Sequence, residues 1–109
     1  MIDLSKKSCV PCNAGTPKLK AAEIRGLIPK LRPDWKVIDD HHLERTLLFK
    51  NFREALAFTN SVGEIAEKEQ HHPDIYLAWG KVKITLWTHK INGLSENDFI
   101  LAARIDKLQ

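Results

Sequence analysis

The feature that most constrains the fold of this chain is a periodic apolar stripe within residues 51–71. Its members recur three or four positions apart, which is typical of one face of an α-helix: Phe52, Ala55, Leu56, Thr59, Val62, Ile65 and Ala66. Asn51 is a suitable N-cap. Pro73 disfavours the α conformation at His72, so we expect the helix to end at about His71. The sequence therefore predicts one long amphipathic helix in the middle of the chain.

Strand-like segments lie in pairs on both sides of this helix. Before it, residues 35–39 and 43–49 have the composition of two strands, joined at Asp40-His41-His42. After it, residues 75–79 and 82–87 alternate between apolar and polar side chains, with a short turn between them. The pattern predicts four strands with hairpin connections.

Two further helices complete the expected order. Residues 18–30 carry apolar side chains at helical spacing, and Pro29 lies near the end of that segment. Residues 95–98 have the S-x-x-D pattern that opens a helix. The order αββαββα predicts an α+β domain, with helices packed on one face of a four-stranded antiparallel sheet. We expect residues 1–17 to form an irregular N-terminal arm and residues 18–109 to form a single domain.

Length and composition exclude several classes of protein. The chain has 109 residues, of which 43% are hydrophobic and 28% charged, so it can bury one core and is too apolar for wholesale disorder. No apolar run approaches the roughly 20 residues that span a bilayer. The net charge of +3 comes from bases interspersed with acids, so we expect no nucleic-acid partner and no membrane partner. The first residues lack the apolar segment of a signal peptide, which favours a cytoplasmic location.

Histidine is the residue type that points to chemistry, because four of the five histidines occur as adjacent pairs. His71 and His72 lie at the end of the predicted long helix. Since Pro73 sends His72 into extended backbone, the two rings must point in different directions. His89 is expected at the far end of the last strand. If the helix end and the strand end meet, these rings and the carboxylate of Asp98 line one cleft.

Two imidazoles in one pocket suit acid–base catalysis. One ring can hold a proton while the other accepts one near neutral pH, because the ordinary pKa of histidine is about 6.5. Such a pair can donate a proton to a leaving hydroxyl group and remove a proton elsewhere. Those two transfers are what a dehydration requires.

The same residues also have purely structural interpretations. A histidine pair at a helix C-terminus interacts favourably with the helix dipole. Asp98 can pair with Ser95 in a capping box, and Glu67 can be an ordinary exposed helix residue. We interpret His41-His42 as a polar hairpin turn. The three tryptophans, taken singly, are typical of packing.

The predicted arm contains a C-x-x-C motif, Cys9-Val10-Pro11-Cys12. A redox motif of this kind normally follows a strand and opens a helix. A zinc site would need a second pair of ligands at a suitable spacing, and adjacent side chains such as His71-His72 rarely bind one ion together. We therefore expect a reduced thiol pair and no metal.

A multi-element pattern over the second half of the chain resembles the signature of pterin-4a-carbinolamine dehydratases: Glu67-x-x-x-His71-His72-Pro73, then Trp79, His89 and Asp98. The cysteine-containing arm and the segment around Trp35 are similar to bacterial members. The resemblance implies the αββαββα fold and the loss of water from 4a-hydroxytetrahydropterin, which gives quinonoid dihydropterin. It implies no metal and no organic cofactor. It also implies tetrahydrobiopterin recycling, with an aromatic amino acid hydroxylase as the source of the substrate.

The resemblance assigns a role to each matching polar residue. It makes His71 and His89 the acid–base histidines, and it gives His72 the task of holding the pterin and assisting proton transfer. Asp98 matches a carboxylate that supports the site. Glu67 matches the acid that opens the signature and also supports the site.

Four further positions bear on the pocket. Pro73 and Trp79 match residues that shape it. Gln70 stands where the animal enzymes have an acid, and Asn97 stands where they have an arginine. We expect these two departures to alter substrate affinity more than chemistry.

Other functions remain open beside the enzyme. Animal relatives also act as dimerisation cofactors of a homeodomain transcription factor, so a non-enzymatic interaction protein is one alternative. A role in molybdopterin metabolism would keep a pterin in the same pocket. The resemblance implies a homodimer or a homotetramer, and a four-stranded sheet leaves edges that can pair.

Overall fold

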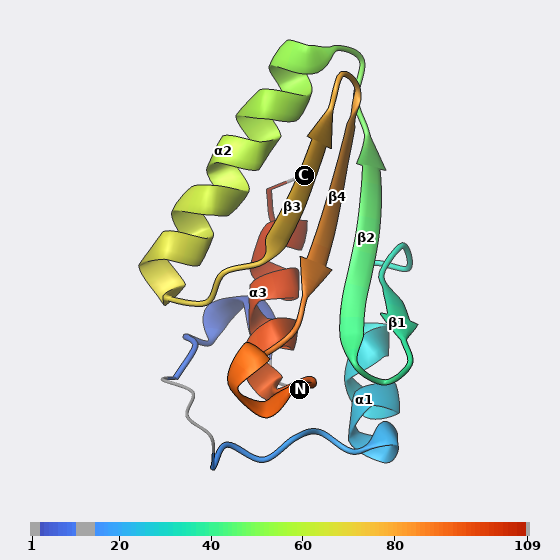
Figure 1. The fold of residues 1–109 in the computed structure, drawn as a ribbon, viewed down its shortest axis with the longest axis vertical. Coiled ribbons are helices and arrows are strands. Elements are labelled where there is room, and N and C mark those ends of the chain that lie inside the picture. Colours follow the sequence, from blue (N-terminus) through green and yellow to red (C-terminus); the bar gives the residue numbers. More distant parts are fainter. Residues whose placement is uncertain (1–2, 11–14, 109) are drawn as a thin grey trace.

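The fold is known from a computed structural model that describes residues 3–10 and 15–108. Its helices are α1 (Ala21–Leu27), α2 (Phe52–Glu69) and α3 (Glu96–Asp106), with 3-10 helices η1 (Leu4–Lys6), η2 (Ile28–Lys30) and η3 (His89–Ile91). Its strands are β1 (Lys36–Ile38), β2 (His42–Leu48), β3 (Asp74–Ala78) and β4 (Lys81–Leu86). The strands form one antiparallel sheet in the order β1-β2-β4-β3. Figure 1 shows α2 alongside β3 and α3 behind the sheet. The predicted α+β fold is confirmed.

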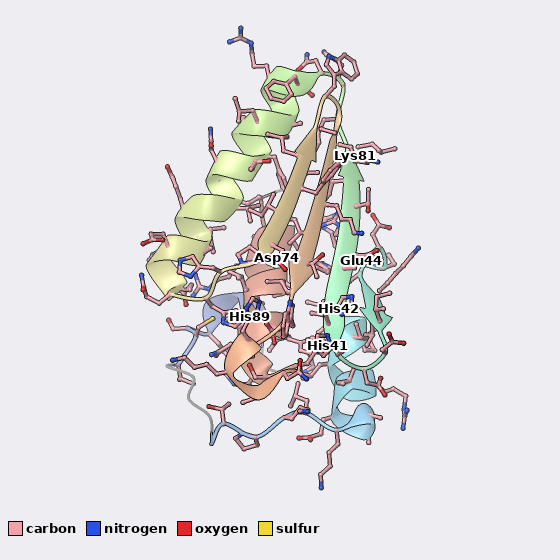
Figure 2. All side chains as sticks on the ribbon, viewed as in Figure 1. His41, His42, Glu44, Asp74, Lys81 and His89 are labelled. Atoms are coloured by element: carbon pink, nitrogen blue, oxygen red, sulfur yellow. The ribbon has the colours of Figure 1, made fainter. Side chains whose placement is uncertain are left out.

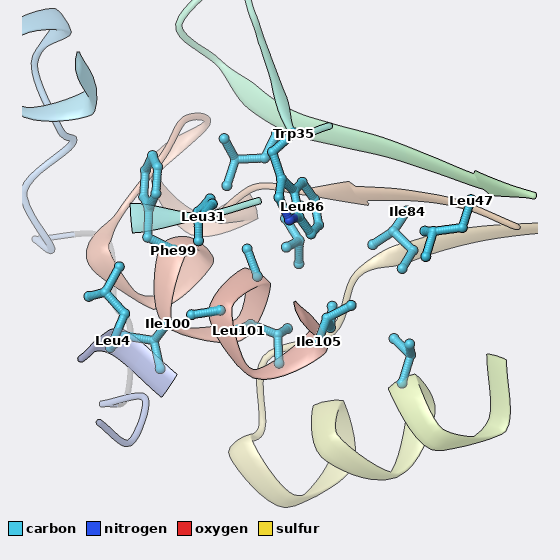
Figure 3. Packing of buried hydrophobic residues seen from close by; sticks show 14 of the residues in the cluster. Leu4, Leu31, Trp35, Leu47, Ile84, Leu86, Phe99, Ile100, Leu101 and Ile105 are labelled. Atoms are coloured by element: carbon cyan, nitrogen blue, oxygen red, sulfur yellow. The ribbon is translucent and has the colours of Figure 1, made fainter. Parts of the chain in front are cut away.

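One face of the sheet forms the core with α2 and α3. The register pairs Leu43 with Leu86 and Leu47 with Val82, so the buried residues of β2 and β4 lie on the same face. Alternate residues of both strands, such as Thr46 and Lys83, point to the opposite face. Figure 3 shows how α3 fits its apolar side chains beneath these strands. The alternation of apolar and polar residues in the sequence therefore corresponds to the core face and the opposite face of the sheet.

The N-terminal arm reaches this core. Within the segment expected to be irregular, η1 packs against α3, and Leu4 is buried among the core residues. The guanidinium group of Arg104 donates two hydrogen bonds to the carbonyl oxygen of Lys7. Residues 3–10 are thus attached to the last helix by both apolar and polar contacts.

Several element boundaries differ from the prediction by a few residues, and three of these differences lie near left-handed residues. α2 ends at Glu69, since Gln70 takes φ 53° and its N–H donates to the carbonyls of the last helical turn. β4 ends at Leu86, and His89 lies in η3, which Asn92 closes at φ 50°. The β1–β2 turn begins at Asp39, and His42 already belongs to β2. None of these changes alters the order of the elements.

Two glycine substitutions should change stability in opposite directions. Gly63 lies within α2 with no neighbouring atom within 4 Å of an added Cβ, so Gly63→Ala is expected to raise the free energy of unfolding by about 0.5–1 kcal/mol. At Gly80 an added Cβ would lie 2.8 Å from the backbone oxygen of Phe49. Gly80→Ala is therefore expected to lower that free energy by about 1–3 kcal/mol. Urea unfolding of the two variants measures both changes, and a shared sign would contradict this packing.

Candidate active site

All three histidines predicted to be catalytic line one cavity of about 270 Å³. The cavity lies where the end of α2, the segment after β4, η3, the start of α3 and the N-terminal arm meet. Its lining consists of Val10, Gln70, His71, His72, Trp87, Thr88, His89, Lys90 and Asn97. Figure 2 shows His89 in the segment that follows β4, at the sheet end where α2 terminates. The end of α2 and the chain beyond β4 thus lie side by side, but the carboxylates of Asp98 and Glu67 are not among the described lining residues.

His71 is held by a buried carboxylate. Its Nε2 lies 2.6 Å from Oδ1 of Asp98, whose side chain is fully buried, while the His71 side chain is 10% exposed. A carboxylate accepts hydrogen bonds, so His71 donates through Nε2. In the neutral ring, Nδ1 is then the proton acceptor. An imidazole fixed in one tautomer by a buried carboxylate is prepared to take a proton and to be stabilised once charged.

The second oxygen of Asp98 is held by two other donors. Oδ2 accepts the hydroxyl of Thr88 at 2.8 Å and the backbone N–H of Ser95 at 2.9 Å. Because the Thr88 hydroxyl gives its hydrogen to Asp98, the Ser95 hydroxyl donates to Thr88 across their 2.8 Å contact. Asp98 therefore caps α3 and orients His71 at once, so the structural and functional interpretations of this residue are compatible.

His72 points away from Asp98, as expected from the extended backbone before Pro73. Its Nε2 lies 2.9 Å from Oε2 of Glu67, and both side chains are largely exposed. Glu67 lies four residues before His71, but α2 ends before His71, and the Glu67 carboxylate pairs with His72 instead. In water this pair is weak, so it orients His72 loosely.

His89 is exposed and stacks on an aromatic ring that the sequence analysis assigned to packing. The centroids of the His89 and Trp87 rings are 3.9 Å apart, with an interplanar angle of 28°. In the alternation of residues 82–87, Trp87 has the opposite parity to Val82, Ile84 and Leu86, the core residues of β4. That parity was the signal that Trp87 could reach a site outside the core.

Pro73 and Trp79 lie outside the described lining of the cavity. Trp79 is in the turn between β3 and β4, and it is 68% exposed. This turn is at the opposite end of β3 from His72, because β3 runs away from the histidine pair. Pro73 lies in the connection between α2 and β3. The expectation that these two residues shape the pocket is therefore not met for Trp79, and for Pro73 the structure shows only its place in the chain path that follows His72.

The two departures from the animal pattern have structural roles next to the cavity. Gln70 occupies the left-handed position that ends α2 and turns the chain toward His71. Asn97 is buried, and its amide contacts both backbone groups of Val10, accepting from the N–H at 3.0 Å and donating to the carbonyl oxygen at 2.6 Å. These bonds hold the arm beside the cavity, so the arm forms one of its walls. No pattern in the sequence indicated that contact.

The structure describes the contacts of only the first cysteine of the C-x-x-C motif. The backbone N–H of Cys9 donates to Oε1 of Glu69 at 2.8 Å, and its thiol lies 3.6 Å from the carbonyl oxygen of Asn97. Cys12 falls outside the described residues, so the expected reduced pair stays a prediction. Within residues 3–10 and 15–108, no three His, Cys, Asp or Glu side chains are arranged to hold a metal ion. In the same part of the chain, no helix has the length and apolar character needed to cross a membrane.

Comparisons with known proteins agree over nearly the whole chain. A family model described as pterin 4 alpha carbinolamine dehydratase matches residues 17–108. A protein of Alkaliphilus metalliredigens is 61% identical over 109 residues, which cover 100% of this chain and 98% of that protein. A protein of Rubrobacter xylanophilus is 54% identical over 108 residues, which cover 99% of this chain and 100% of that protein. Both carry the name pterin-4-alpha-carbinolamine dehydratase as a provisional assignment.

Solved structures show the same arrangement of elements. A protein from Brucella melitensis described as a transcriptional coactivator/pterin dehydratase has a TM-score of 0.78 at 30% identity, covering 84% of this chain and 98% of that chain. A pterin dehydratase-like protein described as a RuBisCO assembly factor in the alpha-carboxysome has a TM-score of 0.57 at 25% identity, covering 72% and 87%. The likeness therefore extends well beyond the residues of the cavity.

Proposed function

The chain belongs to the pterin-4-alpha-carbinolamine dehydratase family, and we propose that the histidines of its cavity dehydrate the carbinolamine by acid–base catalysis. The family makes the protein a hydro-lyase with a pterin substrate. The observation that carries the proposed mechanism is the hydrogen bond between His71 and the buried Asp98, in a cavity that His72 and His89 also line.

The proposed mechanism needs two proton transfers. The bond between the substrate carbon C4a and its hydroxyl oxygen breaks when the oxygen is protonated, and water leaves. A ring N–H of the pterin gives up its proton, and its electron pair forms the new double bond of the quinonoid product. His71 is the base in this scheme, because Asp98 occupies its Nε2 and leaves Nδ1 as the acceptor. His89 is the acid, and His72 helps to hold the pterin and to relay protons.

The proposal also covers the cellular context and the assembly. We propose that a tetrahydropterin-dependent aromatic amino acid hydroxylase supplies the substrate, so that the protein recycles tetrahydrobiopterin or a related pterin. We propose a homodimer or homotetramer, because β1 and β3 form the edges of the sheet among the described strands and sheet edges tend to pair. Residues 18–109 are proposed as the catalytic domain, with the arm as an attached segment.

A second role is suggested by what similar proteins are said to do. The printed descriptions of the two solved structures include a transcriptional coactivator and an assembly factor. A purely binding protein has no need of a buried carboxylate that fixes the tautomer of a cavity histidine. The His71–Asp98 pair therefore favours the enzyme over the interaction protein. The pair does not distinguish the dehydratase from a protein of molybdopterin metabolism, and a preference for the carbinolamine over other pterins would do so.

A direct assay tests the proposed activity. A pterin-dependent aromatic hydroxylase generates 4a-hydroxytetrahydropterin, and rapid absorbance measurements follow its conversion to quinonoid dihydropterin with and without this protein. We expect catalytic amounts of the protein to raise the rate well above the spontaneous rate, since each assisted proton transfer contributes about 10²–10⁴-fold. Conversion at the spontaneous rate, with a correctly folded protein in excess, would reject the proposed function.

A further inference from the structure

We propose that His41 is a positioning residue for His89, and that it acts through Trp87 and Asn92. This inference rests on the proposed function, in which His89 is the proton donor. His41 belongs to the turn between β1 and β2, where its sequence context indicates no more than a polar connection. Figure 2 shows His41, His42 and His89 near the same end of the sheet, although they come from different segments.

The first link is a pair of ring contacts that share Trp87. The His41 ring lies 4.6 Å from the Trp87 ring, with an interplanar angle of 43°, and Trp87 in turn stacks on His89 at 3.9 Å. Trp87 therefore contacts two imidazole rings. His89 is exposed, so its ring would rotate freely without such a surface. A ring that fixes Trp87 thus restricts His89 as well.

The second link passes through the backbone that carries His89. The Nε2 of His41 lies 2.9 Å from Oδ1 of Asn92, which closes η3 in the left-handed conformation. The backbone N–H of Asn92 donates to the carbonyl oxygen of His89 at 3.2 Å. η3 is a single turn of three residues, and short 3-10 turns have weak hydrogen bonds of their own. A side-chain bond at its closing residue therefore limits how far the turn can open.

His42 completes the arrangement by fixing the ring of His41. The Nδ1 atoms of the two histidines are 3.0 Å apart. With His41 donating through Nε2 to the oxygen of Asn92, its Nδ1 accepts the Nδ1–H of His42. Both ring nitrogens of His41 are then engaged while its face contacts Trp87, so the ring has one favoured orientation. This combination explains why a histidine suits the position better than another polar turn residue.

The expected consequence is a loss of kcat with little change in KM. Misplacing a catalytic group by about 1 Å can cost up to about 10²-fold in rate. His41→Ala removes both links, so kcat should fall by about 10- to 10²-fold. His41→Phe keeps a ring face for Trp87 and should recover part of that loss. Asn92→Gly keeps the left-handed backbone but removes the hydrogen-bond acceptor, and should give an intermediate kcat.

The test measures kcat, KM and the NMR resonances of the His89 ring in each variant. Asp40→Asn is the matched control: it lies in the same turn at φ 52°, a conformation that Asn adopts readily, and should match the parent protein. In His41→Ala, the His89 ring protons should lose the ring-current shift that stacking on Trp87 produces. Wild-type kcat together with wild-type His89 resonances in that variant would overturn the proposal.

Two further measurements keep the result unambiguous. Circular dichroism and thermal unfolding show whether each variant folds, and if His41→Ala does not, His41→Phe and Asn92→Gly decide the outcome by the same criteria. If the parent protein fails to dehydrate the carbinolamine, the proposed function is rejected. The His89 resonances still show whether His41 positions that ring, so the two failures are distinguishable.

Discussion

Asp98→Asn is expected to lower kcat by about 10²- to 10⁴-fold, although it exchanges a single oxygen atom for an amide nitrogen. The Thr88 hydroxyl and the Ser95 N–H both donate to Oδ2, so the amide oxygen must take that side. The amide NH₂ then faces Nε2 of His71, at the position where the carboxylate now accepts a hydrogen bond. His71 is forced to accept through Nε2 and to carry its proton on Nδ1. The base would present the wrong tautomer to the pterin.

Two measurements and a control variant separate this effect from a loss of fold. Steady-state kinetics should show the fall mainly in kcat, because the cavity keeps its shape. NMR of ¹⁵N-labelled histidine should show His71 protonated at Nδ1 in the variant and at Nε2 in the parent protein. Glu67→Gln makes the same carboxylate-to-amide change beside His72, where both partners are exposed, and should cost less than about tenfold. Comparable losses in the two variants would argue against a special role for the buried carboxylate.

The order of the elements could be predicted because it depends on local patterns. The stripe of α2 and the alternation of β2 and β4 are visible in the sequence, and each pattern matches a surface that must face the core. The same patterns place His71 and His72 at the end of a helix. Local patterns did not show that these histidines lie near His89. That expectation depended on the resemblance to a family and on the assumption that the end of the helix and the end of the last strand meet.

The path around His89 could not be predicted from local patterns. The alternation of β4 continues through Trp87, and no Gly or Pro interrupts it before Gly93. The strand nevertheless ends at Leu86, and Thr88 pairs with Gly93 instead, while its hydroxyl binds Asp98. A side chain from α3 thus stabilises the turn. A contact between residues that are separated in the sequence does not produce a periodic pattern from which it could be predicted.

Trp79 and His41 show that matching the family signature does not decide whether a residue lies near the site. Trp79 matches the family signature, but the direction of β3 carries it to the turn distant from the histidines. His41 matches nothing in the signature, and the hairpin register brings it against Trp87. Motif spacing identifies residue types along the chain. The three-dimensional path decides which of them meet.

Asp106→Ala is expected to produce the largest loss of stability, about 3–5 kcal/mol in the free energy of unfolding. Arg45 is buried on the core face of β2, and its Nη1 lies 2.8 Å from Oδ1 of Asp106 at the end of α3. The same oxygen accepts the indole N–H of Trp35 at 2.9 Å, and Oδ2 accepts the backbone N–H of Arg32 at 3.0 Å. Removing this carboxylate leaves a buried positive charge without its closest counter-charge and releases two further donors.

Urea unfolding of Asp106→Ala and of two companion variants tests this expectation. Asp34 also approaches Arg45, at 3.7 Å, but it is 66% exposed, so Asp34→Ala should cost less than about 1 kcal/mol. Adding Arg45→Met to Asp106→Ala should recover part of the loss, because it removes the buried charge and keeps much of the volume. If the double variant were less stable than Asp106→Ala alone, the cost would come from lost packing and from the bonds to Trp35 and Arg32. The free energy of unfolding of a domain is about 5–15 kcal/mol, so the expected loss from removing this one carboxylate is a substantial part of the whole.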